Sequence, residues 1–202
     1  MNNEEYLWNM YVGDLGEIGA AAVIGNLKAE SALIPRNLQN SYEKKLGYND
    51  DSYTNAVDSG RMTGDKFAHD CAGYGLAQWT HWSRKASLYQ WTVAIGYSVG
   101  DLTRQGLFVL HELEGYGLVK KLKNCTDLYE ATSIVLRKYE RPADQSDANC
   151  QRRTKIAKEI YDKYAAPVND MPLSEIVALI DKMDDEGQFI QKLAKELREK
   201  IK

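Results

Sequence analysis

The stretch IGAAAVIGNLKAESALIPRNLQ, residues 18–39, decides how this chain folds. Its first part is a run of small and apolar residues with almost no charge, which predicts a largely buried helix. Glu30 stands near the end of that run, and Pro35, which cannot continue a helix, follows shortly after. Desolvation favours the protonated form of a carboxyl group in an apolar wall, and a general acid needs such a group. Glu30 is therefore a catalytic candidate, although a surface glutamate in a last helical turn gives the same pattern.

The composition fits one folded domain of ordinary size, with or without an appendage. The chain has 202 residues, of which 44% are hydrophobic, and this is enough to bury a core. The net charge of −3 argues against nucleic acid as the main partner, because nucleic-acid-binding domains are usually basic. Three widely spaced cysteines without a CxxC pair favour reduced thiols over a disulfide framework.

The N-terminal segment MNNEEYLWNMY lacks a basic stretch followed by an apolar run. We therefore expect no signal peptide, no transmembrane span and no membrane insertion. If the target lies outside a cell, another component must deliver the protein to it.

The apolar pattern predicts a mainly helical α+β domain over residues 1–165. Helical spacing recurs in several segments, namely residues 4–12, 16–30, 81–97, 101–115, 117–124, 126–139 and 148–164. Between residues 31 and 70 this spacing is missing, and about forty residues is too long for a featureless loop. We expect a small β or irregular lobe there, with residues 51–53 as an example of a strand.

A different pattern follows the linker predicted at residues 166–172. In residues 173–202, apolar residues recur alternately three and four positions apart, which is the spacing of a heptad seam. The seam predicts an amphipathic helix. It fits a helix packed on its own domain, and it equally fits a homo-oligomer contact or a connector to a further module.

The stretch DCAGYGLAQWT, residues 70–80, has the features of a cleft wall. Gly73 and Gly75 flank Tyr74, and glycine lets a backbone come close to a ligand or to another chain segment. Gln78 offers both a hydrogen-bond donor and an acceptor. Taken alone, the stretch also fits a tight connection between a strand and a helix.

Three stretches occur in order along the chain: AAVIGNLKAESALIPRNLQ, GYGLAQWT and YERPAD. Together they resemble the lysozyme superfamily, most closely the bacteriophage tail-lysozyme type of peptidoglycan-degrading domain, over residues 16–164. The resemblance implies a two-lobed lysozyme-like fold that cleaves the β-1,4 bond between N-acetylmuramic acid and N-acetylglucosamine. It implies bacterial peptidoglycan as the partner and no cofactor. It also implies a phage lysis protein or virion-associated protein, made in the host cytoplasm and acting on the cell wall.

The resemblance also implies roles for single residues. Glu30 would be the general acid that protonates the glycosidic oxygen. The residues expected to bind substrate in the cleft are Ser31, Tyr74, Gln78, Trp79, Tyr139 and Glu140. Among them, Trp79 is a candidate for stacking on a sugar face, and burial in the core is the alternative for its ring.

A glycosidase usually needs a second carboxyl group, and here its identity is open. Animal-type lysozymes with this motif carry it just before the Tyr-Gly pair, where this chain has Gly73. We expect Asp70 to act as base or electrostatic partner, with Asp58 as the second choice. The other aspartates of the lobe are Asp50, Asp51 and Asp65.

Two alternatives to hydrolysis remain open. With Glu30 acting alone, the enzyme would be a lytic transglycosylase that leaves an anhydro sugar. In a different class, the chain would be a non-catalytic glycan-binding or virion structural module that kept the fold.

Other catalytic motifs are weak. HELEG at residues 111–115 lacks the second histidine of HExxH, so no metal site is expected. Cys71 with His69 or His81 is a minor candidate for a nucleophile pair.

Overall fold

The fold is known from a computed structural model, which describes residues 1–165. The linker predicted at residues 166–172 and the helix predicted at residues 173–202 lie outside the described residues. Within residues 1–165 the chain is mainly helical, as predicted. No helix in this part is both long and apolar enough to cross a membrane.

Helix α1 (Asn3–Ser31) forms the centre of the described domain. The break predicted between two helices is a kink at Gly16, whose φ of 68° is one that side-chain-bearing residues rarely adopt. After the kink, the segment from residue 19 to residue 27 is buried, which confirms the buried helix predicted from its small residues. Helix α1 ends at Ala32 in the left-handed conformation, so Glu30 lies in its last turn.

The region between residues 31 and 70 is helical, and the β structure predicted there is wrong. It contains α2 (Asn40–Leu46), α3 (Asp50–Asp58) and α4 (Gly64–His69). Residues 51–53, expected as a strand, lie inside α3. Strand-like pairing in residues 1–165 is limited to two isolated bridges, Leu38 with Tyr74 and Tyr74 with Trp79.

Helix caps explain why these short segments are helical. The side chain of Asn49 accepts a hydrogen bond from the backbone N–H of Ser52, and the hydroxyl of Ser52 accepts one from the backbone N–H of Asn49. This reciprocal pair is a capping box at the start of α3. Thr63 caps α4 in a similar way, through the backbone N–H of Lys66.

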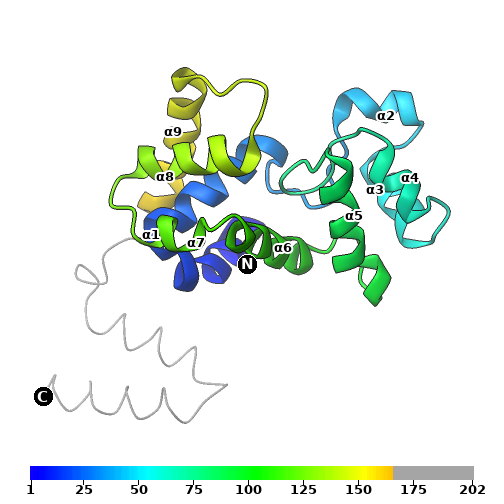
Figure 1. Cartoon of the computed structure of the whole chain (residues 1–202), viewed down its shortest axis with the longest axis horizontal. Coiled ribbons are helices and arrows are strands. Elements are labelled where there is room, and N and C mark those ends of the chain that lie inside the picture. The colour runs from blue at the N-terminus through cyan, green and yellow to red at the C-terminus, as the bar shows by residue number, and fades with distance from the viewer. Residues whose placement is uncertain (166–202) are drawn as a thin grey trace, which may run out of the picture. The chain divides into compact units, whose positions relative to one another are not determined.

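The helices predicted after residue 80 are confirmed, with small shifts of their ends. They are α5 (Trp82–Trp91), the short turn η1 (Val93–Ile95), α6 (Leu102–Gly115), α7 (Val119–Lys123), α8 (Leu128–Ile134), the π-helical turn η2 (Val135–Glu140) and α9 (Asp147–Tyr164). Helix α1 packs against α7, α8 and α9, while α4 packs against α5. Figure 1 shows α2 to α5 gathered on one side of the described domain and α1, α8 and α9 on the other.

Candidate active site

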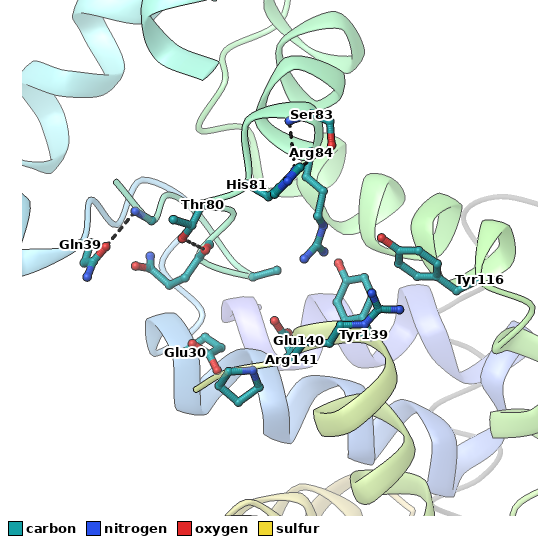
Figure 2. Close-up of a pocket in the computed structure, with 14 residues that line it drawn as sticks. Glu30, Gln39, Thr80, His81, Ser83, Arg84, Tyr116, Tyr139, Glu140 and Arg141 are labelled. Carbon is teal, nitrogen blue, oxygen red and sulfur yellow. Dashed lines mark hydrogen bonds between the residues drawn. The ribbon is translucent and has the colours of Figure 1, made fainter. Parts of the chain in front are cut away.

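A cavity of about 770 Å³ is lined by residues from both groups of helices. This volume lies in the range of small-molecule binding sites. Of the predicted site residues, four line it: Glu30, Gln78, Tyr139 and Glu140. The other lining residues are Gln39, Gly73, Ala77, Thr80, His81, Ser83, Arg84, Tyr116, Arg141 and Pro142. Figure 2 shows Glu30 and Glu140 on one side of the cavity and the Arg84 side chain pointing toward them from α5.

Glu30 enters the cavity from the last turn of α1 and is tied to α9. The Nη2 atom of Arg153 donates to Glu30 Oε1 at 2.5 Å, and the Glu30 side chain is 20% exposed. The same guanidinium donates to Asn26 Oδ1 at 3.3 Å, one turn earlier on α1. Arg153 is buried, so its charge is balanced mainly by the carboxylate of Glu30.

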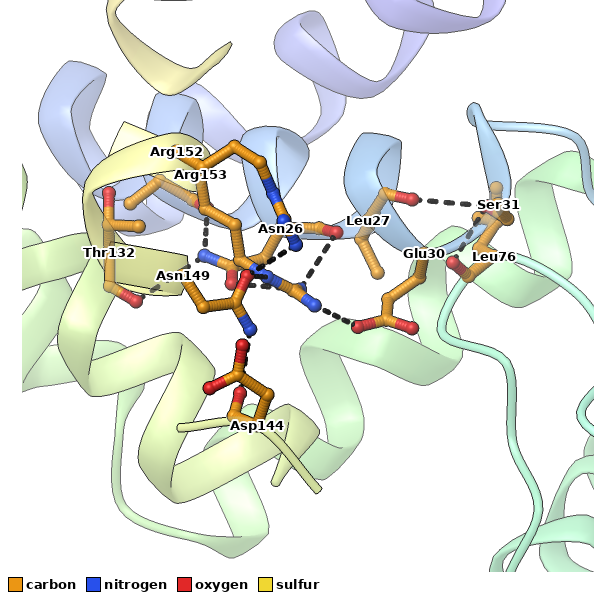
Figure 3. A network of polar contacts seen from close by, with 11 residues as sticks. Asn26, Leu27, Glu30, Ser31, Leu76, Thr132, Asp144, Asn149, Arg152 and Arg153 are labelled. Carbon is orange, nitrogen blue, oxygen red and sulfur yellow. Dashed lines mark hydrogen bonds and ion pairs between the residues drawn. The ribbon is translucent and has the colours of Figure 1, made fainter. Parts of the chain in front are cut away.

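Further polar contacts hold Arg153 in place, as Figure 3 shows. The Oδ1 atom of Asn149 accepts from Arg153 Nε at 3.4 Å and from Arg152 Nη2 at 2.7 Å. The amide of Asn149 in turn donates to the backbone carbonyl of Asp144 at 2.6 Å. The first turns of α9 and the loop before it therefore support the partner of Glu30.

Glu140 is the last residue of the π-helical turn η2. Its Oε1 atom is buried and finds no hydrogen-bond partner among residues 1–165. Burial raises the pKa of the Glu140 carboxyl well above its ordinary value, and the negative charge of Glu30 raises it further. Arg84 and Arg153 oppose this rise without cancelling it. Glu140 is therefore a carboxyl group that keeps its proton at a pH where an exposed glutamate has lost it.

Three predicted binding residues lie behind the cavity wall instead of in it. The Ser31 hydroxyl donates to the carbonyl of Leu76 at 2.8 Å and thus joins α1 to the glycine-rich stretch. The Tyr74 hydroxyl shares a hydrogen bond of 2.7 Å with Thr54 Oγ1. Trp79 is 0% exposed, so its indole ring cannot stack on a sugar in the cavity. These three residues support the cavity without lining it.

Gly73 lines the cavity where a second carboxylate was expected. A Cβ atom there would come within 2.8 Å of the Gln78 Oε1 atom. The amide of Gln78 is held by Asn37, since Nε2 donates to Asn37 Oδ1 at 2.8 Å. The backbone N–H of Gly73 donates to Gln39 Oε1 at 3.0 Å. The Gln78 side chain thus occupies the space that a side chain at position 73 would need.

Asp70 lies outside the cavity, in a buried ion pair. Its Oδ1 atom accepts from Lys85 Nζ, and its Oδ2 atom accepts from the hydroxyl of Tyr53. Lys85 is 0% exposed, and burial lowers its pKa although Asp70 opposes the effect. These contacts hold the Asp70 side chain in a structural ion pair, so it does not face Glu30.

Asp58 is also outside the cavity. It accepts hydrogen bonds from the backbone N–H of Val99 at 2.8 Å and from the hydroxyl of Ser98 at 2.5 Å. Both contacts fix the chain before α6. The second carboxyl group in the cavity wall is therefore Glu140, which the family resemblance implies only as a substrate-binding residue.

The comparison with protein-family models decides the family of this chain. The family model described as phage tail lysozyme matches residues 2–164. The chain belongs to the phage tail lysozyme family. No curated protein and no solved structure matched it. The family confirms the resemblance and points to a lysozyme-type hydrolase with peptidoglycan as its substrate, which fits a phage-associated protein that acts on the cell wall.

Sequence reasoning missed one residue of this phage tail lysozyme, Glu112 on α6. Its carboxylate accepts from Trp79 Nε1 and from the Tyr139 hydroxyl, each at 2.8 Å. Arg84 makes a two-point contact with it, from Nε at 2.7 Å and from Nη2 at 2.8 Å. Glu112 thus holds η2, α5 and the glycine-rich stretch together beside Glu140. The HELEG motif contains Glu112, but the spacing of that motif gives no sign of these contacts.

The metal and thiol motifs considered in the sequence can be located in the described part of the chain. In the described part of the chain, no group of three His, Cys, Asp or Glu residues is placed to hold a metal ion. Cys71 is exposed and donates to the carbonyl of His69 at 3.6 Å. It does not line the cavity, so its pairing with His69 or His81 has no place in the site.

Proposed function

We propose that this phage tail lysozyme is a muramidase that hydrolyses the β-1,4 bond between N-acetylmuramic acid and N-acetylglucosamine, with Glu30 as an essential catalytic carboxyl group. The observation that supports this most is the position of Glu30. It lies where the buried helix α1 ends at a cavity large enough for part of a glycan, next to a second carboxyl group. Glycosidases act with two such groups on either side of the scissile bond.

Two guanidinium groups near the cavity are paired with glutamates, Arg84 with Glu112 and Arg153 with Glu30. Arg141 also lines the cavity. The amide of Gln78 and the hydroxyls of Thr80, Ser83 and Tyr116 also line the space and suit the hydroxyl and acetamido groups of sugars.

Product analysis of digested peptidoglycan tests the proposal. Wild-type protein is expected to release fragments with new reducing ends on N-acetylmuramic acid. An anhydro end would identify a lytic transglycosylase instead. Binding to cell walls without any released fragment would identify a non-catalytic module.

The variant Glu30→Gln tests the role of Glu30. We expect the rate of fragment release from peptidoglycan to fall by a factor of about 10² or more. A positioned acid or base contributes a factor of about 10²–10⁴ to the rate of a catalysed reaction. Cell-wall binding should remain. Glu114→Gln is the matched control, since Glu114 is an exposed glutamate of α6. Unchanged release by Glu30→Gln would remove Glu30 from the mechanism.

A further inference from the structure

The two guanidinium groups that line the cavity differ in their partners. Arg84 is paired with the carboxylate of Glu112 at 2.7 Å. Arg141 is exposed and forms no ion pair with any residue between 1 and 165. Its only side-chain hydrogen bond within that range runs from Nε to the carbonyl of Lys138, at 2.9 Å. A guanidinium has five N–H donors, so the donors on both Nη atoms of Arg141 remain available to a ligand.

Aromatic contacts hold the guanidinium of Arg141 in place. Its Cζ atom lies 5.4 Å from the centroid of the Tyr116 ring, which is within the range of a cation–π contact. The Tyr116 ring packs edge-to-face on Tyr139, with centroids 6.2 Å apart and planes at 62°. The Tyr139 hydroxyl donates to Glu112 at 2.8 Å. A guanidinium positioned in this way loses less conformational freedom when it binds a ligand.

The backbone of Arg141 has a conformation that favours glycine. Its φ of 51° and ψ of 48° lie in the left-handed region, which side-chain-bearing residues adopt only rarely. The backbone N–H of Arg141 donates to the carbonyl of Leu136 at 2.8 Å and closes the π-helical turn η2. Backbone strain of this kind and π-helical turns both occur often at functional sites. An arginine at a position where glycine fits with less strain indicates a role for its side chain.

We propose that Arg141, supported by Tyr116, binds a carboxylate of the stem peptide that N-acetylmuramic acid carries in peptidoglycan. The inference rests on the proposed muramidase function and extends it from the sugar chain to the peptide attached to it. The sugars of a peptide-bearing strand are neutral, and its carboxylates belong to the stem peptides. The planar fork of a guanidinium matches a carboxylate through two parallel hydrogen bonds.

The position of this contact suits a substituent of the sugar chain. In Figure 2, Glu140 and Tyr139 lie between Glu30 and Tyr116. The cleaved bond at Glu30 and the carboxylate at Arg141 would therefore occupy different parts of one cavity. Burial raises the pKa of Glu140 well above its ordinary value, so this neighbour of Arg141 is neutral and does not repel an approaching carboxylate.

Three soluble glycans separate recognition of the peptide from recognition of the sugars. The first is a peptidoglycan strand with its stem peptides. The second is the same strand after an amidase has removed the peptides, which leaves a free lactyl carboxylate on each muramic acid. The third is an oligomer of N-acetylglucosamine, which has the same β-1,4 linkage and no carboxylate.

Calorimetry of the full chain measures binding of each glycan, with Glu30→Gln present in every protein to prevent cleavage. Adding Arg141→Gln should raise the Kd for the stem-bearing strand about 10-fold, the effect of losing a hydrogen bond between charged groups. The Kd values for the stripped strand and for the N-acetylglucosamine oligomer should stay unchanged. Arg141→Lys keeps the charge without the planar fork and should give an intermediate Kd for the stem-bearing strand.

Two further variants separate the guanidinium from the fold and from general surface charge. Arg141→Gly suits the left-handed backbone and should lose as much affinity for the stem-bearing strand as Arg141→Gln. Lys138→Gln removes the same charge from an exposed residue of the same turn that does not line the cavity. It should bind the stem-bearing strand as tightly as the protein that carries Glu30→Gln alone.

Four outcomes would overturn the proposal. An unchanged Kd for the stem-bearing strand in Arg141→Gly would exclude a role for the guanidinium. An equal loss in Lys138→Gln would show an effect of surface charge only. An equal loss on the stripped strand would assign the contact to the lactyl carboxylate instead of the peptide. An equal loss on the N-acetylglucosamine oligomer would show that Arg141 binds the sugars.

Kinetics with Glu30 intact keep this proposal apart from the proposed function. On the stem-bearing strand, Arg141→Gln should raise KM about 10-fold and change kcat by less than about twofold, as expected for a contact that is equal in the ground state and the transition state. A fall in kcat without a change in KM would contradict a binding role. If the protein with Glu30 intact cleaved no strand, the muramidase function would fail, whereas the calorimetric comparison would still decide whether Arg141 binds the stem peptide.

Discussion

Arg153 and Glu30 form an ion pair that joins α9 to the last turn of α1, with Arg153 Nη2 donating to Glu30 Oε1 at 2.5 Å. The pair brings together residues that lie 123 positions apart in the chain. Because Glu30 lines the cavity, the folding of the C-terminal helix of the described domain determines where the carboxylate points. The stability of the domain and the geometry of its site are thus linked through one contact.

The variant Arg153→Gln should lose both stability and activity. Removing a hydrogen bond to a charged group leaves Glu30 without its partner, and we expect the free energy of unfolding to fall by roughly 1–3 kcal/mol. The rate constant kcat should fall more than the affinity for glycan, since Glu30 is misplaced while most of the cavity remains. Denaturant unfolding and steady-state kinetics measure the two effects.

Arg152→Gln is the matched control for that variant. Arg152 is the preceding residue on α9, is exposed, and contacts Asn149 without reaching Glu30. We expect it to change stability by less than about 1 kcal/mol and to leave kcat unchanged. Equal effects of the two variants on kcat would argue against a specific role for the Arg153–Glu30 pair.

The pH dependence of stability should reveal Glu140. Its pKa is raised in the folded protein, so its contribution to stability is complete at pH values below 4.5, the ordinary value of a glutamate. That contribution is lost as the pH rises toward the folded pKa, because the unfolded chain then releases the proton more readily. Relative to wild type, Glu140→Gln should therefore become more stable with rising pH, by at most about 1.4 kcal/mol per pH unit.

Thermal or denaturant unfolding from pH 4 to pH 8 provides the measurement. The difference in unfolding free energy between wild type and Glu140→Gln should be smallest at pH 4, where both side chains are neutral. A difference that stays constant across this range would contradict the raised pKa. Glu114→Gln, which changes an exposed glutamate, should show no such slope.

Asp70→Asn separates a structural role of Asp70 from a catalytic one. The change leaves the ammonium of Lys85, which is 0% exposed, without its counter-charge. Removing one partner of a buried ion pair costs roughly 3–5 kcal/mol, so we expect a large loss of unfolding free energy. At a temperature where the variant is still folded, kcat should stay close to that of wild type. A folded Asp70→Asn protein with a 10²-fold loss in kcat would restore Asp70 as a catalytic candidate.

Glu30 could be predicted because its determinants are local. The small residues that bury α1, the glutamate and the proline that follows all lie within one stretch of sequence. A carboxyl group at the end of a buried helix can be inferred from such a stretch without knowing what packs on it.

The environment of Glu140 could not be predicted in this way. The stretch YERPAD contains the residue, but its burial depends on elements that come from other parts of the chain. Arg84 and Glu112 pair across α5 and α6, and Tyr139 joins that pair through its hydroxyl. These contacts depend on tertiary packing, which residue spacing does not encode.

The helices between residues 31 and 70 were missed for a different reason. They are only six to nine residues long, so apolar periodicity has too few repeats to appear. Their caps were visible in the sequence, as the Asn49 and Ser52 pair shows. Capping residues are thus the better guide to short helices in this part of the chain.

Gly25 provides a test of how closely α1 and α9 approach each other. A Cβ atom at Gly25 would lie 2.8 Å from the Cβ and 2.9 Å from the backbone N of Ala157. Since backbone atoms cannot turn aside, Gly25→Ala should push the helices apart and lower the free energy of unfolding by about 1–3 kcal/mol. The shift would also move Arg153 relative to Glu30, so kcat should fall with stability. Gly13→Ala is the control on the same helix, because nothing lies within 4 Å of its added methyl group. It should be neutral or stabilising by up to about 1 kcal/mol, and a Gly25→Ala protein as stable as Gly13→Ala would contradict the close packing of α1 on α9.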